Sequence, residues 1–451
     1  MKKKHSILYD SIVQQINRLS DSVIAEAFAE QLEASGAGID EFVTVTERLR
    51  GFGADLVGAK ARREHFAYWS DLRLCLEDFA VKFSAFPDLN FVKHRLELMI
   101  ATKLAQIAPT IDMADIDDEQ FELRELSTTL PIHLFVRENA KTFSDSTVVL
   151  SVRDIAAFEA ELAQANISPE LAFRLLAAIQ AKAQVSIQHY ALIKRSTPAI
   201  SDAGVEAFCC LSLLSVGHPV HVPRTYELPP RLIDCDRLQA GIAYNQMNEI
   251  MYVLSEYNSH KQLLSKYLTL YHVVENFMYR MPIARLEQAH GGAMFSIRDF
   301  QRLYKEVEEK EQPAIRKLFA AVAQVEYEPG KLFRARVISN WTAACAGIAP
   351  GDVQVALGKF GLKQNGLAMS APVFTTTDLP TNFAQLVYGV RCAIVHNKET
   401  EFHLTYANLD AGIAHLIEKF LIPTLEEVCF HLVSGTNSVV WYTNSELKLF
   451  A

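Results

Sequence analysis

The stretch Tyr388-Gly389-Val390-Arg391-Cys392-Ala393-Ile394-Val395-His396-Asn397 sets an Arg and a His five positions apart in an apolar segment. Apolar residues at three- and four-residue intervals predict a helix over 383–396. The polar run from Asn397 to Glu401 follows immediately, so the His is expected where this helix meets solvent.

Arg391 and His396 supply two functions that handling a phosphodiester requires. A guanidinium donates two parallel hydrogen bonds to phosphate oxygens, and an imidazole transfers a proton near neutral pH. On an ideal helix, five residues separate the two side chains by roughly 140°. They converge only if the helix distorts or ends by His396, or if a second subunit supplies the partner group.

The same Arg-to-His spacing occurs at Arg285 and His290, so spacing alone is not specific. That pair lies in a polar helix end before two glycines, which is typical of a solvated surface. Only the later pair is accompanied by apolar residues that predict a rigid platform, namely Phe383, Leu386, Val387, Val390 and Ile394.

A helix predicted over 259–280 carries a carboxylate on its apolar stripe. Glu275 continues the four-three spacing set by Leu264, Leu268, Tyr271 and Met278. A carboxylate in that position needs a partner. Two interpretations stay open: Glu275 reaches solvent or a structural ion pair, or it orients Arg391 or His396.

Together these two helices resemble the HEPN superfamily, the higher eukaryotic and prokaryotic nucleotide-binding helical bundles. Lys266-Tyr267-Leu268-Thr269-Leu270-Tyr271-His272-Val273-Val274-Glu275-Asn276-Phe277 is similar to the first core helix, and Tyr388-x2-Arg391-Cys392-x3-His396-Asn397 to the third. The resemblance covers about 239–451 and implies a helical bundle. Many members are metal-independent ribonucleases of toxin, antiviral-defence and RNA-processing systems.

The resemblance implies an endoribonuclease whose homodimer brings two copies of Arg391 and His396 into one cleft. Arg391 would hold the phosphate of an RNA substrate and His396 would transfer protons, while Asn397 positions the scissile group and Glu275 tunes the pair. No metal and no cofactor is implied. The N-terminal half would be a sensor or specificity module, for which a regulatory protein partner is a reasonable expectation.

One position departs from the family pattern. The residue after the Arg is often Asn, Asp or His, and here it is Cys392, whose thiol is a weaker hydrogen-bonding group than an amide. The alternative function is therefore a catalytically silent HEPN-like scaffold for dimerisation or partner binding. In that alternative, Arg391 forms a structural ion pair with Glu275.

Composition limits the class of protein. The chain has 451 residues, of which 50% are hydrophobic and 22% charged, which predicts a soluble protein with two or three cores. A net charge of −9 argues against a nonspecific nucleic-acid coat but not against a local basic cleft. Seven cysteines without Cys-x-x-Cys spacing favour a reduced compartment. With no signal peptide, and a longest apolar run (207–214) too short for a bilayer, a cytoplasmic protein is expected.

The chain is predicted to be mainly helical and to divide into four parts. These are a helical segment (1–110), a small α+β element (111–217), a proline-rich linker (218–238) and the HEPN-like helical domain (239–451). In the α+β element we expect strands over 132–136, 148–152 and 185–193, and helices over 154–165 and 169–182. In the last part we expect helices over 239–281, 297–311, 314–325, 383–396 and 407–432, then a β-hairpin of 439–442 and 447–450.

Four further motifs are weaker, and each has a more ordinary interpretation as helix surface or connection. They are the glycine pattern from Gly53 to Lys60, the aspartates Asp112, Asp115, Asp117 and Asp118, the pair His218 and His221, and the basic patch of Arg48, Arg50, Lys60, Arg62 and Arg63.

Overall fold

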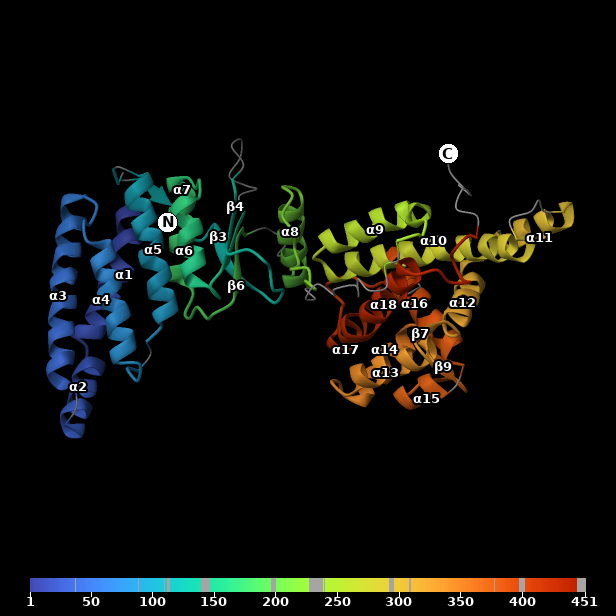
Figure 1. Cartoon of the computed structure of the whole chain (residues 1–451). Helices are drawn as coiled ribbons and strands as arrows, with labels where there is room; N and C mark the ends of the chain where they lie inside the picture. Colours follow the sequence, from blue (N-terminus) through green and yellow to red (C-terminus); the bar gives the residue numbers. More distant parts are fainter. Residues whose placement is uncertain are drawn as a thin grey trace. The chain divides into compact units, whose positions relative to one another are not determined.

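The computed structural model describes residues 1–36, 38–87, 89–108, 110–111, 114–138, 147–195, 200–226, 238, 240–291, 296–307, 310–376, 378–396 and 402–443. The chain divides into two compact units, Met1–Val222 and Pro223–Ala451. The division falls inside the proline-rich stretch, where each proline fixes its own φ and disfavours helix in the residue before it. The fold is mainly helical with small antiparallel sheets, as predicted (Figure 1).

Helices form the first half of the first unit. Ser22 and Asn90 cap two of them, because their side chains accept hydrogen bonds from the backbone N–H groups of Ala25 and Lys93. The helices are α1 (Lys4–Ser20), α2 (Val23–Ser35), α3 (Ile39–Arg62), α4 (Trp69–Lys82) and α5 (Phe91–Ile107). A two-residue pairing joins β1 (Lys2–Lys3) to β2 (Asp115–Ile116) near the start of the chain.

A four-stranded antiparallel sheet follows in the order β3-β6-β5-β4. Its strands are β3 (Phe121–Leu126), β4 (Leu134–Arg137), β5 (Thr147–Ser151) and β6 (His189–Lys194). The three predicted strands correspond to β4, β5 and β6, although β6 begins four residues later than expected. Strand β3 was not predicted, because three charged residues interrupt its apolar positions.

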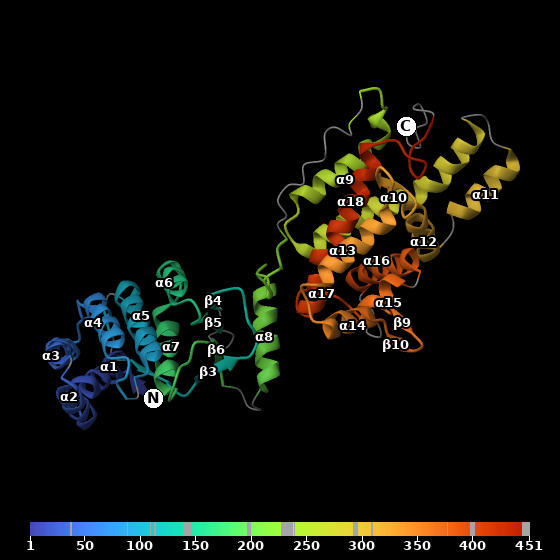
Figure 2. The same ribbon diagram turned by 60° about the horizontal axis from the view of Figure 1, so that its bottom comes forward.

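Side chains on the two faces of this sheet enter different cores. Val148, Leu150 and Leu192 join the large core that also contains residues of α1 to α5. Val149 and Ala191 point the other way and pack with residues of α8 (Asp202–Leu214). Figure 2 shows α7 (Pro169–Ala181) and α8 on opposite sides of the sheet, with α6 (Ile155–Gln164) near its edge. The helical segment and the α+β element therefore share one core.

The second unit is a helical bundle around a long central helix, α10 (Leu263–His290), and one large core joins most of its helices; no residue of α11 belongs to it among those described. The other helices are η3 (Tyr244–Met247), α9 (Asn248–Ser259), α11 (Ile297–Val307), α12 (Glu311–Val322), α13 (Phe333–Cys345), α14 (Pro350–Lys359), α15 (Ala371–Thr376), α16 (Leu379–Val395), α17 (Ala411–Leu416), the π-helix η4 (Ile417–Leu421) and α18 (Ile422–Ser434). Two short ribbons pair β7 (Glu326–Glu328) with β8 (Lys331–Leu332), and β9 (Lys363–Gln364) with β10 (Leu367–Ala368).

The predicted terminal hairpin is wrong in its first half. Residues 439–442 form a turn and an irregular segment rather than a strand, and 447–450 lie outside the described residues. Side chains satisfy this backbone instead: Asn437 Oδ1 accepts from the N–H groups of Val439 and Val440, at 3.1 and 3.0 Å. The indole N–H of Trp441 donates to Leu432 O at 2.7 Å. Residues 439–442 are therefore apolar because they fill the bundle core, and not because they form a strand.

None of the helices in the described ranges is both long and apolar enough to cross a membrane.

Candidate functional site

Helix α16 carries Arg391 and is fixed on three sides. Phe383 packs edge-on against Phe319 of α12, with ring centroids 4.7 Å apart. The fully buried Tyr267 of α10 donates its hydroxyl to Val387 O at 2.5 Å. Gly389 permits close contact with Phe360, because a Cβ there would lie 3.2 Å from Phe360 O. Residue 391 is therefore presented from a rigid support.

The helix ends at Val395, and this end brings Arg391 and His396 together. His396 has an extended backbone (φ −95°, ψ 121°), while its N–H still donates to Cys392 O at 2.8 Å. The imidazole leaves the helical path and places its Nε2 3.2 Å from Arg391 Nη1. Because a guanidinium only donates, Nε2 accepts and the proton of the neutral imidazole lies on Nδ1. The convergence occurs within one chain.

Two glutamates flank the guanidinium. Arg391 Nη2 lies 3.5 Å from Glu275 Oε1, and Arg391 Nε lies 3.5 Å from Glu311 Oε1. Tyr271 donates its hydroxyl to the same Glu311 oxygen at 2.6 Å, and its ring lies 5.6 Å from Arg391 Cζ. The side chain of Arg391 is 18% exposed. The structure thus places Glu275 beside Arg391.

Glu311 is a member of this cluster that the sequence did not indicate. We expected it at the end of a helix over 297–311, but it lies in the first turn of α12. A carboxylate is favourable there because the N-terminal end of a helix carries partial positive charge. This preference was the only signal in the sequence for the position of Glu311 in a first turn. It does not show which side chain Glu311 faces.

The pKa values in the cluster follow from burial and mutual charge. Burial raises the pKa of Glu275; Arg391 opposes this effect and the charge of Glu311 adds to it. Burial acts to lower the pKa of Arg391, but Glu311 and Glu275 outweigh it and the pKa is raised. Burial and the hydrogen bond to Glu311 keep the Tyr271 hydroxyl protonated, with a pKa far above its ordinary value. When both glutamates are ionised, the three charged groups sum to one negative charge.

Cys392 follows Arg391 in α16, and its side chain is half-buried. Its hydrogen bond with Tyr388, together with burial, raises the pKa of that phenol to about 12. A hydrogen bond with Cys392 is also among the influences on Arg391. The thiol therefore takes part in the polar contacts around the guanidinium.

A second segment supports His396 from the far side. Leu404 N donates to Ala393 O at 2.7 Å, and His403 Nδ1 lies 3.2 Å from His396 O. Asn408 closes a turn over this segment by accepting from Thr405 N at 2.7 Å. Asn397, expected to position the scissile group, lies outside the described residues.

Two of the other sequence candidates, the second Arg-to-His pair and the glycine pattern, form no site. Arg285 is exposed, and His290 Nε2 lies 3.4 Å from Asp299 Oδ2. The glycine pattern from Gly53 to Lys60 lies inside the continuous helix α3 and therefore forms no phosphate-binding loop. Within the described part of the chain, no group of three or more His, Cys, Asp or Glu side chains is arranged to hold a metal ion.

Comparisons of the chain with models of known protein families, with curated proteins and with solved structures find no match.

Proposed function

We propose that this protein is a metal-independent endoribonuclease of the HEPN type, acting as a homodimer through its second unit. The observation that supports this proposal is the 3.2 Å approach of Arg391 Nη1 to the imidazole Nε2 of the exposed residue His396. The approach combines a phosphate-binding cation with an imidazole, a group that can accept or donate a proton. The helix end at Val395 creates it from residues that an ideal helix would separate.

In the proposed reaction the RNA 2′-oxygen attacks the adjacent phosphorus. The substrate phosphate first takes the Arg391 N–H that His396 Nε2 accepts, and Arg391 then donates its hydrogen bonds to the phosphate oxygens. The freed Nε2 of a neutral His396 takes the proton of the 2′-hydroxyl as the new oxygen–phosphorus bond forms. The bond to the 5′-oxygen breaks, and an acid protonates that leaving oxygen. The products are a 2′,3′-cyclic phosphate and a 5′-hydroxyl. In the homodimer, the second copy of His396 would serve as this acid.

The two glutamates bear on how Arg391 engages RNA. Both carboxylate distances are 3.5 Å, which is longer than the roughly 2.7–2.9 Å of a strong charge-assisted hydrogen bond. A phosphate that approaches closely would compete with them effectively. Because burial and Glu311 favour protonation of Glu275, loss of its negative charge would ease that approach.

The test is cleavage of labelled single-stranded RNA by the full chain in EDTA. We expect Arg391→Ala and His396→Ala to abolish cleavage and wild type to yield 2′,3′-cyclic phosphate ends. Arg285→Ala and His290→Ala are matched controls, since they alter the same residue types at the same spacing, and they should retain activity. Cleavage that survives both Arg391→Ala and His396→Ala would refute the assignment.

The second candidate is a catalytically silent scaffold for dimerisation or partner binding. It is favoured by the placement of Arg391 between Glu275 and Glu311, which is also the geometry of a structural ion pair. This function predicts no cleavage of any RNA in a varied panel. Arg391→Ala would then lower the melting temperature or dissociate the dimer, as light scattering would measure.

A prokaryotic defence or toxin role belongs to the same proposal. It predicts that expression of the wild-type chain in bacteria arrests growth, whereas His396→Ala at equal protein level does not. Equal growth of the two strains would count against a toxin role.

A further inference from the structure

The longest apolar run of the chain, 207–214, forms most of α8 and leaves an apolar face exposed. The inner face of α8 packs on the four-stranded sheet through Val205, Cys209 and Leu213. Its outer face exposes three large apolar side chains, namely Leu211 (66% exposed), Leu214 (53%) and Phe208 (43%). A helix that is apolar on both sides is expected to be covered on both sides. The outer face of α8 is therefore a candidate interface.

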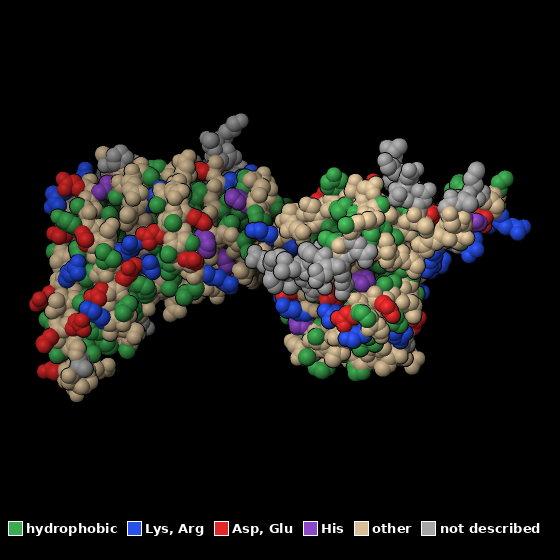
Figure 3. Space-filling model, viewed as in Figure 1, with side chains coloured by type: hydrophobic (Ala, Val, Ile, Leu, Met, Phe, Trp, Pro, Cys, Tyr) green, Lys and Arg blue, Asp and Glu red, His purple; other side chains and the backbone are tan. Residues whose placement is uncertain are grey.

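The outer face of α8, every residue of which the structure describes, carries no charged side chain between Ala203 and Ser215. Glu206 belongs to another side of the helix, where it accepts from Ser127 N at 2.6 Å. Elsewhere on the first unit, acidic and basic side chains are mixed over the face seen in Figure 3. Membrane-surface helices and nucleic-acid sites use basic residues, whereas the centre of a protein–protein interface is depleted of charge. A protein partner is therefore favoured.

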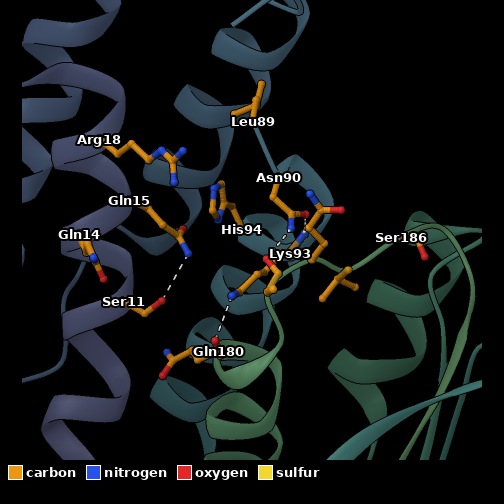
Figure 4. Close-up of a pocket in the computed structure, with 13 residues that line it drawn as sticks. Ser11, Gln14, Gln15, Arg18, Leu89, Asn90, Lys93, His94, Gln180 and Ser186 are labelled. Carbon is orange, nitrogen blue, oxygen red and sulfur yellow. Dashed lines mark hydrogen bonds between the residues drawn. The ribbon is translucent and has the colours of Figure 1, made fainter. Parts of the chain in front are cut away.

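A polar pocket of about 620 Å³ lies between α1, the start of α5 and the loop after α7 (Figure 4). Its polar groups bind one another. Gln15 Nε2 donates to Glu97 Oε2 at 2.7 Å, and Lys93 Nζ donates to Gln180 O at 3.0 Å. These hydrogen bonds account for the pocket as a polar junction between helices. The apolar face of α8 has no such explanation within the first unit.

Small and large residues are segregated along the outer face of α8. At 100° per residue, Ala203, Ala207, Leu211 and Leu214 lie within an arc of roughly 80°, and all four are exposed. The alanines occupy the first half of the helix and the leucines the second. If two copies of α8 pack antiparallel about a two-fold axis, Ala207 of one copy faces Leu211 of the other, and Ala203 faces Leu214. Each leucine then fills the space over an alanine, as side chains of packed helices interdigitate.

Charges at the two ends of α8 favour the same orientation. Asp202, in the first turn, is 87% exposed and lies 3.0 Å from Arg124 Nη1, an arginine that also pairs with Glu122. At the other end, the exposed Arg137 donates from Nη1 to Ser215 Oγ at 3.3 Å. An antiparallel pair brings the Asp202 end of each copy beside the Arg137 end of the other. A parallel pair would bring like charges together.

We propose that the outer face of α8 binds α8 of a second copy of this chain, as an antiparallel helix pair. The uncharged centre, the alanines opposite leucines and the opposite charges at the ends all support a self-complementary surface. The proposal is independent of the ribonuclease site, because every residue in it belongs to the first unit.

Disulfide cross-linking of the full-length protein tests the register. In the double variant Ala203→Cys/Leu214→Cys, each introduced thiol faces the other position on the second copy, so oxidation should give a covalent dimer. Within one helix the two positions lie about 16 Å apart, whereas a disulfide needs Cα atoms within about 7 Å. In either single variant, the two equivalent positions lie about 15 Å or more apart along the helices. The single variants should therefore cross-link no more than wild type, and they control for the native cysteines.

Light scattering over a range of protein concentrations tests association without cross-linking. Leu211→Glu should raise the apparent dissociation constant for self-association at least roughly tenfold, because a two-fold interface loses the leucine twice. Leu74→Glu, at a leucine of α4 that is 54% exposed, is the matched control and should leave it unchanged. Both substitutions are at exposed positions, so both variants should fold.

Three results would overturn the proposal. These are equal cross-linking in the single and double variants, equal association of Leu211→Glu and wild type, and equal losses in Leu211→Glu and Leu74→Glu. Dimerisation through the second unit alone would give the second of these results. RNA cleavage is not part of either measurement, so failure of the ribonuclease proposal would leave both outcomes unchanged.

Discussion

Glu97 of α5 is predicted to make the first unit less stable as pH rises. Its side chain is 0% exposed and accepts hydrogen bonds from Gln15 Nε2 at 2.7 Å and Ser11 Oγ at 3.2 Å. Burial outweighs these hydrogen bonds and the nearby Lys93, and raises the pKa of Glu97 from 4.5 to about 7. The folded state therefore holds a proton that the unfolded state releases at lower pH.

The sign and size follow from linkage. Between pH 4.5 and about 7 the folded chain binds more protons at Glu97 than the unfolded chain, so the free energy of unfolding falls as pH rises. The stabilisation is complete below pH 4.5 and is lost by the time pH exceeds the folded pKa. The two pKa values differ by about 2.5, and at about 1.36 kcal/mol for each pKa unit the full loss is roughly 3 kcal/mol. Glu97→Gln, which is neutral throughout, should remove this dependence.

The assay is native-state hydrogen exchange of α5 amides at several pH values, corrected for intrinsic exchange. Exchange reports the first unit separately from the second, which a single melting temperature does not. We expect the stability difference between Glu97→Gln and wild type to rise in favour of the variant by roughly 2 kcal/mol from pH 5.5 to 8. Glu30→Gln, at an exposed position of α2, is the control and should show no such trend. A flat difference for Glu97→Gln would refute the reasoning.

Three further predictions concern the second unit. Tyr271→Phe removes the hydroxyl donated to Glu311 and should lower the free energy of unfolding by about 1–2 kcal/mol in urea titrations; an unchanged value would show that this contact is not stabilising. Arg280→Ala removes hydrogen bonds to Val440 O and to Gln246, so it should lower the free energy of unfolding by roughly 3 kcal/mol and speed proteolysis after residue 435. The control Arg334→Ala, at an exposed position, should change neither quantity. In the His396→Ala background, Glu275→Gln should tighten RNA binding about fivefold, because the carboxylate that competes with phosphate for Arg391 is gone. The magnitude follows because a partly exposed ion pair contributes up to about 1 kcal/mol. The exposed Glu256→Gln is its control, and equal affinities for the two variants would mean that Arg391 does not contact phosphate.

Local patterns predicted the helices of the site and the pairing of Glu275 with Arg391, but not the contact with Glu311. The spacing around Leu264 and Phe383 was sufficient for α10 and α16, because amphipathic periodicity reports which side of a helix is buried. It was silent on Glu311, whose meeting with Arg391 depends on how α12 packs against α16. The pocket of the first unit that Arg18, Lys93 and Gln184 line could not be predicted from the sequence either, because these residues come from segments far apart in the chain.

Where prediction failed, side chains satisfied the backbone in place of regular structure. The run 439–442 has strand-forming residues, yet Asn437 and Arg280 take the backbone groups that a neighbouring strand would have paired. Strand β3 is the opposite case, since its ladder with β6 forms despite Glu122, Arg124 and Glu125. Tertiary context decided both outcomes.

The helix end at Val395 means that Arg391 and His396 have separate mechanical supports. Side chains from α10 and α12 hold the guanidinium, whereas the backbone N–H of Leu404 and the imidazole of His403 hold the chain that carries the His396 imidazole. Substitutions in 402–408 can therefore shift one group while leaving the other in place. The distance between cation and imidazole is thus adjustable from the 402–408 segment, without any change to the half-buried glutamates that flank Arg391.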